Sequence, residues 1–278
     1  MTNIVNYKHC HKYQTISYIK KLNLKYTKIK TYNLNIIDTF LLLQKIDNKF
    51  IYDSYNLSLH LKDLISKNIT IKSLFTDNEW LLIPIRYKIL YNKKIKDLYN
   101  NIDNWIELLG FLKNLGNILF LEDFGKLPEW LLLCDTYPLG CKFNKLNKNF
   151  NKKFYKKSKN FKNIKYNTKF GIYKKYCGFN NLFMSHDMNT FICEKLLKTK
   201  IPKEVIYILK FSKFKSWINS DDKYSRAYTY LANDYDWEML PLLKLINIKP
   251  INNYIYNINL IKKYYSNLIK KYLKNIKF

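Results

Sequence analysis

Residues that build tight turns and metal sites are scarce in this chain of 278 residues. Six glycines and six prolines are few for a many-stranded sandwich or barrel, and long runs of Leu, Ile, Lys and Asn favour helices instead. The five cysteines contain no CxxC pair, which argues against a structural zinc site. An odd number of cysteines in a chain this large does not indicate a disulfide framework. No apolar run approaches the ~18 residues that a membrane-spanning helix needs.

Acidic residues are also in short supply. Lys and Arg number 49 against 21 Asp and Glu, a net charge of +28, and arginine occurs only at Arg86 and Arg226. A surface this basic attracts polyanions. Lys, Asn, Ile and Tyr have AT-rich codons, so codon bias is the competing explanation, but it does not explain the shortage of acids. Two interpretations stay open, a solvated lysine coat and a surface for nucleic acid.

Apolar and aromatic residues are plentiful, at 47% and 17% of the chain, which predicts a packed globular core. Apolar residues recur at helical spacing over residues 38–70, 78–99 and 105–117. Residues 260–272 have the pattern of an amphipathic basic helix, with an apolar face at 261, 265, 268 and 272. These patterns predict an all-α fold.

The N-terminus is basic and contains no acid as far as residue 37. We therefore expect a basic extension or targeting segment over residues 1–32, followed by one helical domain over residues 33–278. An acid-free basic start is typical of an organelle transit peptide, and the alternative is an arm that lies on RNA. His9, Cys10 and His11 are metal-binding residue types, but three adjacent residues cannot close a tetrahedral site.

A second acid-free stretch runs from Thr136 to His186, and its most basic part is a predicted polybasic loop over residues 142–169. Lysines neutralise phosphates, and aromatic rings interleaved with them can stack on unpaired bases. A codon-driven insertion is the alternative. The lysines predicted to bind nucleic acid are Lys152, Lys153, Lys156, Lys157, Lys159, Lys162 and Lys165, and the interleaved rings are Phe150, Phe154, Tyr155, Phe161, Tyr166 and Tyr173.

Five short motifs occur in the order in which one known family has them. Residues 134–141, Cys-Asp-Thr-Tyr-Pro-Leu-Gly-Cys, are similar to its Gly-Asp-Thr-Phe-Pro-Val-Gly-Cys loop. The others are Gly171-Ile172-Tyr173 with Cys177-Gly178, Ile201-Pro202-Lys203-Glu204, Asp236 with Met239-Leu240-Pro241, and Tyr264-Tyr265 with Lys271-Tyr272. Over roughly residues 33–278 the chain thus resembles the myo-inositol oxygenase family. The resemblance implies an HD-domain-like helical bundle and a non-haem di-iron site that opens myo-inositol to glucuronate with dioxygen.

The resemblance also implies which residues stand where that family binds iron through four His and two Asp. Only two ligand-type residues are kept, His186 and Asp236, which we expect to be the remnant of the metal site. The substituted ligand positions are Leu81, Lys113, Asn114 and Ser212, and the family's substrate-binding Lys falls on Asn117. The four histidines of the whole chain stand at 9, 11, 60 and 186, too dispersed to rebuild a site that needs several imidazoles.

These substitutions predict a catalytically degenerate protein with no catalytic residue and no cofactor. Its expected role is a basic scaffold or RNA-binding component, with ribosomal RNA and neighbouring proteins of a mitochondrial ribosome as partners. The alternative function is an active inositol oxygenase with rearranged iron ligands. A phosphohydrolase of the wider HD class is a third hypothesis, for which His186-Asp187 is the one His-Asp pair. The expected compartment is the mitochondrion, with the cytoplasm as the alternative.

Overall fold

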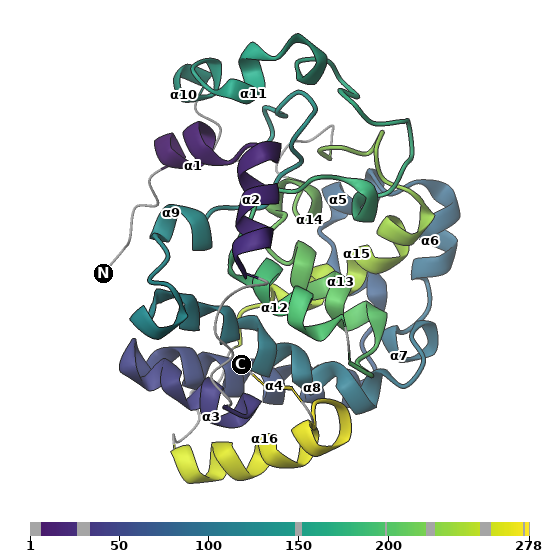
Figure 1. The fold of residues 1–278 in the computed structure, drawn as a ribbon. Helices are drawn as coiled ribbons and strands as arrows, with labels where there is room; N and C mark the ends of the chain where they lie inside the picture. Colours follow the sequence, from purple (N-terminus) through teal and green to yellow (C-terminus); the bar gives the residue numbers. More distant parts are fainter. Residues whose placement is uncertain are drawn as a thin grey trace.

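The computed structural model describes residues 7–26, 34–147, 152–197, 199–220, 226–250, 257–274 and 276–277. These residues form helices joined by short loops, with isolated β-bridges such as Pro138 with Met184 and no longer strand among them. The predicted all-α fold is confirmed (Figure 1). Within the described residues, no helix is both long and apolar enough to cross a bilayer.

Two closely packed helices, α4 (Asn48–Ser66) and α8 (Ile102–Lys113), form the base of the core. Gly110 permits their close approach, because a Cβ there would lie 2.3 Å from Ser58 Oγ and 2.6 Å from the backbone O of Ser54. Ser58 Oγ donates to Glu107 O at 2.7 Å across the same contact. The helices α3 (Ile36–Leu41) and α16 (Ile258–Tyr272) cover them, and Tyr265 lies among Phe40 and Phe111.

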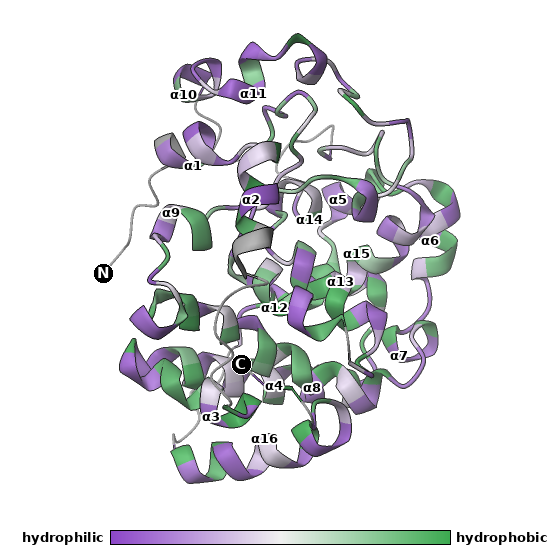
Figure 2. Ribbon diagram, in the orientation of Figure 1, coloured by the Kyte–Doolittle hydropathy of each residue, from purple (hydrophilic) through white to green (hydrophobic). Residues whose placement is uncertain are grey.

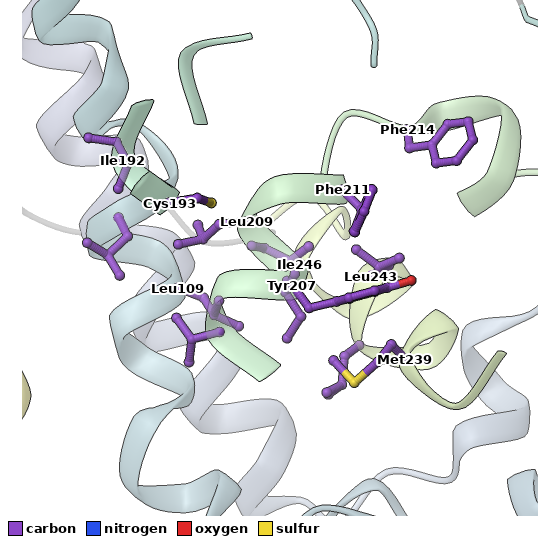
Figure 3. Close-up of a cluster of buried hydrophobic side chains, with 14 of the residues drawn as sticks. Leu109, Ile192, Cys193, Tyr207, Leu209, Phe211, Phe214, Met239, Leu243 and Ile246 are labelled. Carbon is purple, nitrogen blue, oxygen red and sulfur yellow. The ribbon is translucent and has the colours of Figure 1, made fainter. Parts of the chain in front are cut away.

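Three further helices pack on this base, and they are α12 (Met188–Leu196), α13 (Lys203–Phe211) and α15 (Asp234–Ile246). Side chains from α8, α12, α13 and α15 meet in one apolar cluster, shown in Figure 3 around Leu109, Ile192, Tyr207 and Leu243. Figure 2 shows the same contrast along the ribbon, with apolar residues frequent on the central helices and polar residues frequent on the outer ones. α12 and α15 each begin with a capping box, built on Asp187 and Asn233.

The predicted helix over residues 78–99 is divided into α5 (Asp77–Leu81), α6 (Ile85–Tyr91) and α7 (Ile95–Leu98). Pro84 stands at the N-cap of α6, and a new helix starts there because proline fixes φ and has no N–H to donate to the preceding turn. The short helices α9 (Glu129–Leu132) and α14 (Lys215–Ile218) lie in the loops that follow α8 and α13.

The upper part of Figure 1 is a smaller unit made by α1 (Tyr7–Tyr13), α2 (Ile16–Tyr26), α10 (Lys152–Lys156) and α11 (Lys159–Lys162). It has its own hydrophobic cluster, separate from the main core, formed by Ile16, Ile19, Tyr137, Leu139, Phe143 and Tyr155. We call residues 152–169 the basic lobe and residues 9–22 the N-terminal segment. Residues 9–22 are thus packed on the rest of the chain, and the other parts of the predicted 1–32 extension fall partly outside the described residues.

Candidate functional site

Lys113 and Asn114 lie at the C-terminal end of α8. The Nδ2 of Asn114 donates to Phe50 O and to Ser54 Oγ, both at 3.2 Å, so this residue faces α4. The Nζ of Lys113 donates to Ile246 O at 2.8 Å, at the C-terminal end of α15. A cation at that end also complements the helix dipole.

Ser212 lies at the same end of α15. It caps the C-terminus of α13, and its Oγ donates to Leu209 O at 2.9 Å and accepts from Asn189 Nδ2 at 2.8 Å. The Nδ2 of Asn247, the residue after Ile246, donates to Ser212 O at 3.1 Å. The structure therefore brings Lys113, Asn114 and Ser212 to one place, where α8, α13 and α15 end, and we call these three residues the substituted centre.

Leu81 is not part of the substituted centre. Its side chain is 72% exposed at the end of α5. The helix that faces Asn114 is α4, through Phe50 and Ser54, because α4 packs along α8. The structure therefore does not bring Leu81 together with Lys113, Asn114 and Ser212.

Asp236 also lies elsewhere. It is in the first turn of α15, ten residues before Ile246, which is about 15 Å along a helix. Its carboxylate accepts from Phe179 N at 3.0 Å, from Asn233 N at 2.8 Å and from Tyr207 Oη at 2.7 Å. Burial raises the pKa of Asp236, and these hydrogen bonds oppose the rise. This residue caps a helix and anchors a loop, so it does not share a site with Lys113 or Ser212.

His186 is buried beside the cap of α12. Its backbone is held by one side chain, since its N–H donates to Gln14 Oε1 at 2.6 Å and its carbonyl accepts from Gln14 Nε2 at 3.0 Å. Burial lowers the pKa of His186 to about 3, so the imidazole is neutral at physiological pH. The neighbouring Asp187 carboxylate accepts from Asn189 N and Thr190 N, both at 3.0 Å, and this capping role occupies the acid of the one His-Asp pair.

Two partly buried lysines set the charge around the substituted centre. Burial, and secondarily the charge of Lys213, lowers the pKa of Lys113 to about 8. Lys213 donates to Leu132 O at 2.9 Å, and burial lowers its pKa while Asp187 and Asp135 oppose that change. Both ammonium groups repel cations at the position that the resemblance assigns to iron.

The donor set does not fit a di-iron centre. Such a centre needs imidazoles and carboxylates that converge, whereas the substituted centre offers an ammonium, an amide and a hydroxyl, all hydrogen-bonded to protein. No group of three or more His, Cys, Asp or Glu residues arranged for a metal occurs in the part of the chain that the structure describes.

The basic lobe presents its lysines to solvent. All seven lysines predicted to bind nucleic acid are exposed. The interleaved rings differ from the prediction, because Tyr155 is buried in the smaller hydrophobic cluster and Tyr173 bonds to Leu139 O and Phe183 N. Phe154, Phe161 and Tyr166 are partly buried, and Phe150 lies outside the described residues. Charge, more than stacking, is what this surface offers.

Three features of the site were not expected from the sequence. Gln14 holds His186, although no motif surrounds it. Asn189 bonds Ser212, and its position two residues after Asp187 in a capping box was the available signal. Cys10 and Cys134 form a disulfide with Cα atoms 6.7 Å apart, although no disulfide framework was predicted. The two cysteines are 124 residues apart, so no rule based on sequence spacing could have predicted the pair.

Comparisons with known proteins agree with this architecture. A model of the myo-inositol oxygenase family matches residues 84–278. The chain therefore belongs to the inositol oxygenase family, as the motifs predicted.

Individual relatives cover different shares of the chain. A probable inositol oxygenase of Oryza sativa subsp. japonica is 33% identical over 59% of this chain and 52% of its own length. Inositol oxygenase of Dictyostelium discoideum is 36% identical over 52% of this chain and 48% of its own length. Inositol oxygenase 2 of Arabidopsis thaliana is 27% identical over 93% of this chain and 73% of its own length. The chain thus spans about half the length of the first two relatives.

Proposed function

We propose that this chain is a catalytically degenerate member of its family that acts as a basic, RNA-binding scaffold. The observation that carries the proposal is Lys113, whose partly buried ammonium donates to Ile246 O at the position that the resemblance assigns to an iron ligand. Asn114 and Ser212 are likewise hydrogen-bonded to protein groups, and each would have to give up these bonds in order to bind a metal. The fold of an inositol oxygenase is kept while its cation site is closed by hydrogen bonds.

The charge of the surface supports the proposed partner. The lysines of the basic lobe stand on short helices that are fixed to the rest of the chain, and a fixed array of cations can displace counterions from a nucleic acid backbone. We propose ribosomal RNA as the polyanion, with neighbouring proteins of a mitochondrial ribosome as further partners. The mitochondrion is the proposed compartment, and the cytoplasm is the alternative.

The first experiment tests loss of catalysis. Purified protein is analysed for bound iron and for oxygen consumption with myo-inositol, with the Dictyostelium relative prepared in parallel as the reference. We expect less than one iron for every ten chains and no inositol-dependent oxygen uptake. Two irons in each chain, or turnover that His186→Ala abolishes, would establish the active inositol oxygenase instead.

The second experiment tests the RNA partner. Lys152, Lys153, Lys156 and Lys157 are changed together to Ser, and a control carries Ser at the exposed Lys93, Lys94, Lys263 and Lys270. Each phosphate contact that is lost lowers the salt slope of binding to single-stranded RNA by roughly 0.7, so the first variant loses up to about 3 in slope and the control retains it. Equal losses in the two variants would mean that net charge, not the basic lobe, is responsible. Sedimentation of the native protein with ribosomal particles at low salt, and release at high salt, tests the ribosomal setting.

A further inference from the structure

The N-terminal segment is fastened to the chain at two points close in sequence. Cys10 is bonded to Cys134, just after α9. Four residues later, the Gln14 side chain makes both backbone hydrogen bonds to His186, and the Gln14 carbonyl accepts from Asn160 Nδ2 at 3.0 Å. Gln14 therefore links the domain interior to the basic lobe.

The basic lobe rests on this segment. The His11 ring packs edge-on against Phe143 at 4.9 Å and against Tyr155 at 5.9 Å, and Tyr155 is the buried residue of α10. Ile16 and Ile19 complete the same hydrophobic cluster, which is separate from the main core. The order of α10 and α11 thus depends on apolar contacts that the N-terminal segment supplies.

We infer that the Cys10–Cys134 disulfide is a redox latch that controls the order of the basic lobe and, through it, the binding of RNA. The inference rests on the proposed function for the identity of the ligand, but not for the latch itself. Opening the latch breaks the Cys10–Cys134 bond and consumes two glutathione molecules, which become glutathione disulfide, while each cysteine sulfur gains one electron and one proton. Closing it is the reverse exchange, in which glutathione disulfide takes up the two electrons.

Both sulfur atoms are buried, because Cys10 and Cys134 are each 1% exposed. Exchange with glutathione therefore waits until the N-terminal segment opens, and the Gln14 hydrogen bonds oppose that opening. The reduced state is also accommodated, since Cys10 Sγ lies 3.3 Å from Trp130 O, an acceptor for its thiol. In a reducing compartment a disulfide is usually transient and responds to the redox state, whereas a structural disulfide stays formed.

The test compares oxidised and glutathione-reduced protein by hydrogen exchange over residues 152–166 and by RNA affinity at one salt concentration. Intact mass without reductant first establishes the bond, as a mass lower than that of the reduced chain by two hydrogen atoms. We expect exchange in the basic lobe to quicken roughly tenfold after reduction, with weaker RNA binding. Cys10→Ser should reproduce the reduced state, whereas Cys177→Ser, at a partly buried thiol outside the disulfide, should change neither reading. Gln14→Ala should keep the bond but speed its reduction by glutathione.

The possible outcomes separate the latch from the proposed function. Equal exchange in the two redox states, or a chain that retains free thiols at Cys10 and Cys134 with oxidised glutathione, overturns the latch and leaves RNA binding to stand. Faster exchange on reduction, with no RNA bound in either state, supports the latch and removes the RNA partner.

Discussion

Replacing Lys113 by Met should stabilise the protein, although it removes a hydrogen bond. Burial lowers the Lys113 pKa from 10.5 to about 8. Because one pKa unit corresponds to 1.36 kcal/mol, keeping this ammonium in the folded state at pH 7 costs about 3 kcal/mol. Met has a similar length and no charge, and the lost bond to Ile246 O is worth about 1 kcal/mol. The net expectation is a gain of about 2 kcal/mol.

The pH dependence of the free energy of unfolding tests the Lys113 pKa more directly than the stability at one pH does. Between pH 8 and 10.5 the unfolded chain binds more protons at Lys113 than the folded chain does, so wild-type stability rises with pH across that window. The Lys113→Met variant should lack this contribution. Urea unfolding at pH 7, 8, 9 and 10 measures both effects, and the exposed Lys45→Met is the matched control, for which no comparable gain is expected.

Two results would refute this reasoning. A loss of more than about 1 kcal/mol at pH 7 would mean that the bond to Ile246 O outweighs the cost of burying the charge. An unchanged rise in stability between pH 8 and 10 would mean that Lys113 does not titrate there. Either result would remove the electrostatic argument against a cation at the substituted centre.

Three further predictions concern stability. Asp236→Ala should cost about 3–5 kcal/mol in urea unfolding without changing the iron content, since three donors lose their acceptor and two of them are buried. A cost below about 1 kcal/mol would contradict the capping role. In wild type the buried imidazole, with a pKa of about 3, stays neutral between pH 6.5 and 4 while the unfolded imidazole binds a proton, so about 3 kcal/mol of stability is lost in this range. The His186→Gln variant should not show this loss. An identical acid profile in the variant would rule this out. Gly110→Ala should lower stability by about 2–3 kcal/mol, because its Cβ meets α4 backbone and Ser58, and a neutral result would show that α4 and α8 can separate.

Local patterns predicted the all-α fold because each core helix presents apolar residues at helical spacing, as α8 does from Trp105 to Leu112. Motif order alone assigned Lys113, Asn114 and Ser212 to one site, and the structure places all three where α8, α13 and α15 end. Asp236 lies away from them, because ten residues of α15 separate it from Ile246. Leu81 is exposed at the end of α5, and the helix that packs along α8 is α4.

Contacts between distant segments were the part that the sequence could not supply. Gln14 and Cys10 meet partners far along the chain, and no periodicity relates such residues. The burial of Tyr155 likewise depends on His11, from another segment, so an aromatic ring in a lysine-rich stretch looked available for stacking when it was in fact packed.

The pairing of Gln14 with His186 also has a consequence during synthesis. The two residues are 172 positions apart, and ribosomes add about 5–20 residues each second. The N-terminal segment therefore waits roughly 10–30 s for its binding surface to be made. During that interval its Ile16 and Ile19 remain unburied and accessible to chaperones. A nascent chain halted before His186 should accordingly remain sensitive to protease at Lys20 and Lys21, and gain resistance once that residue has emerged.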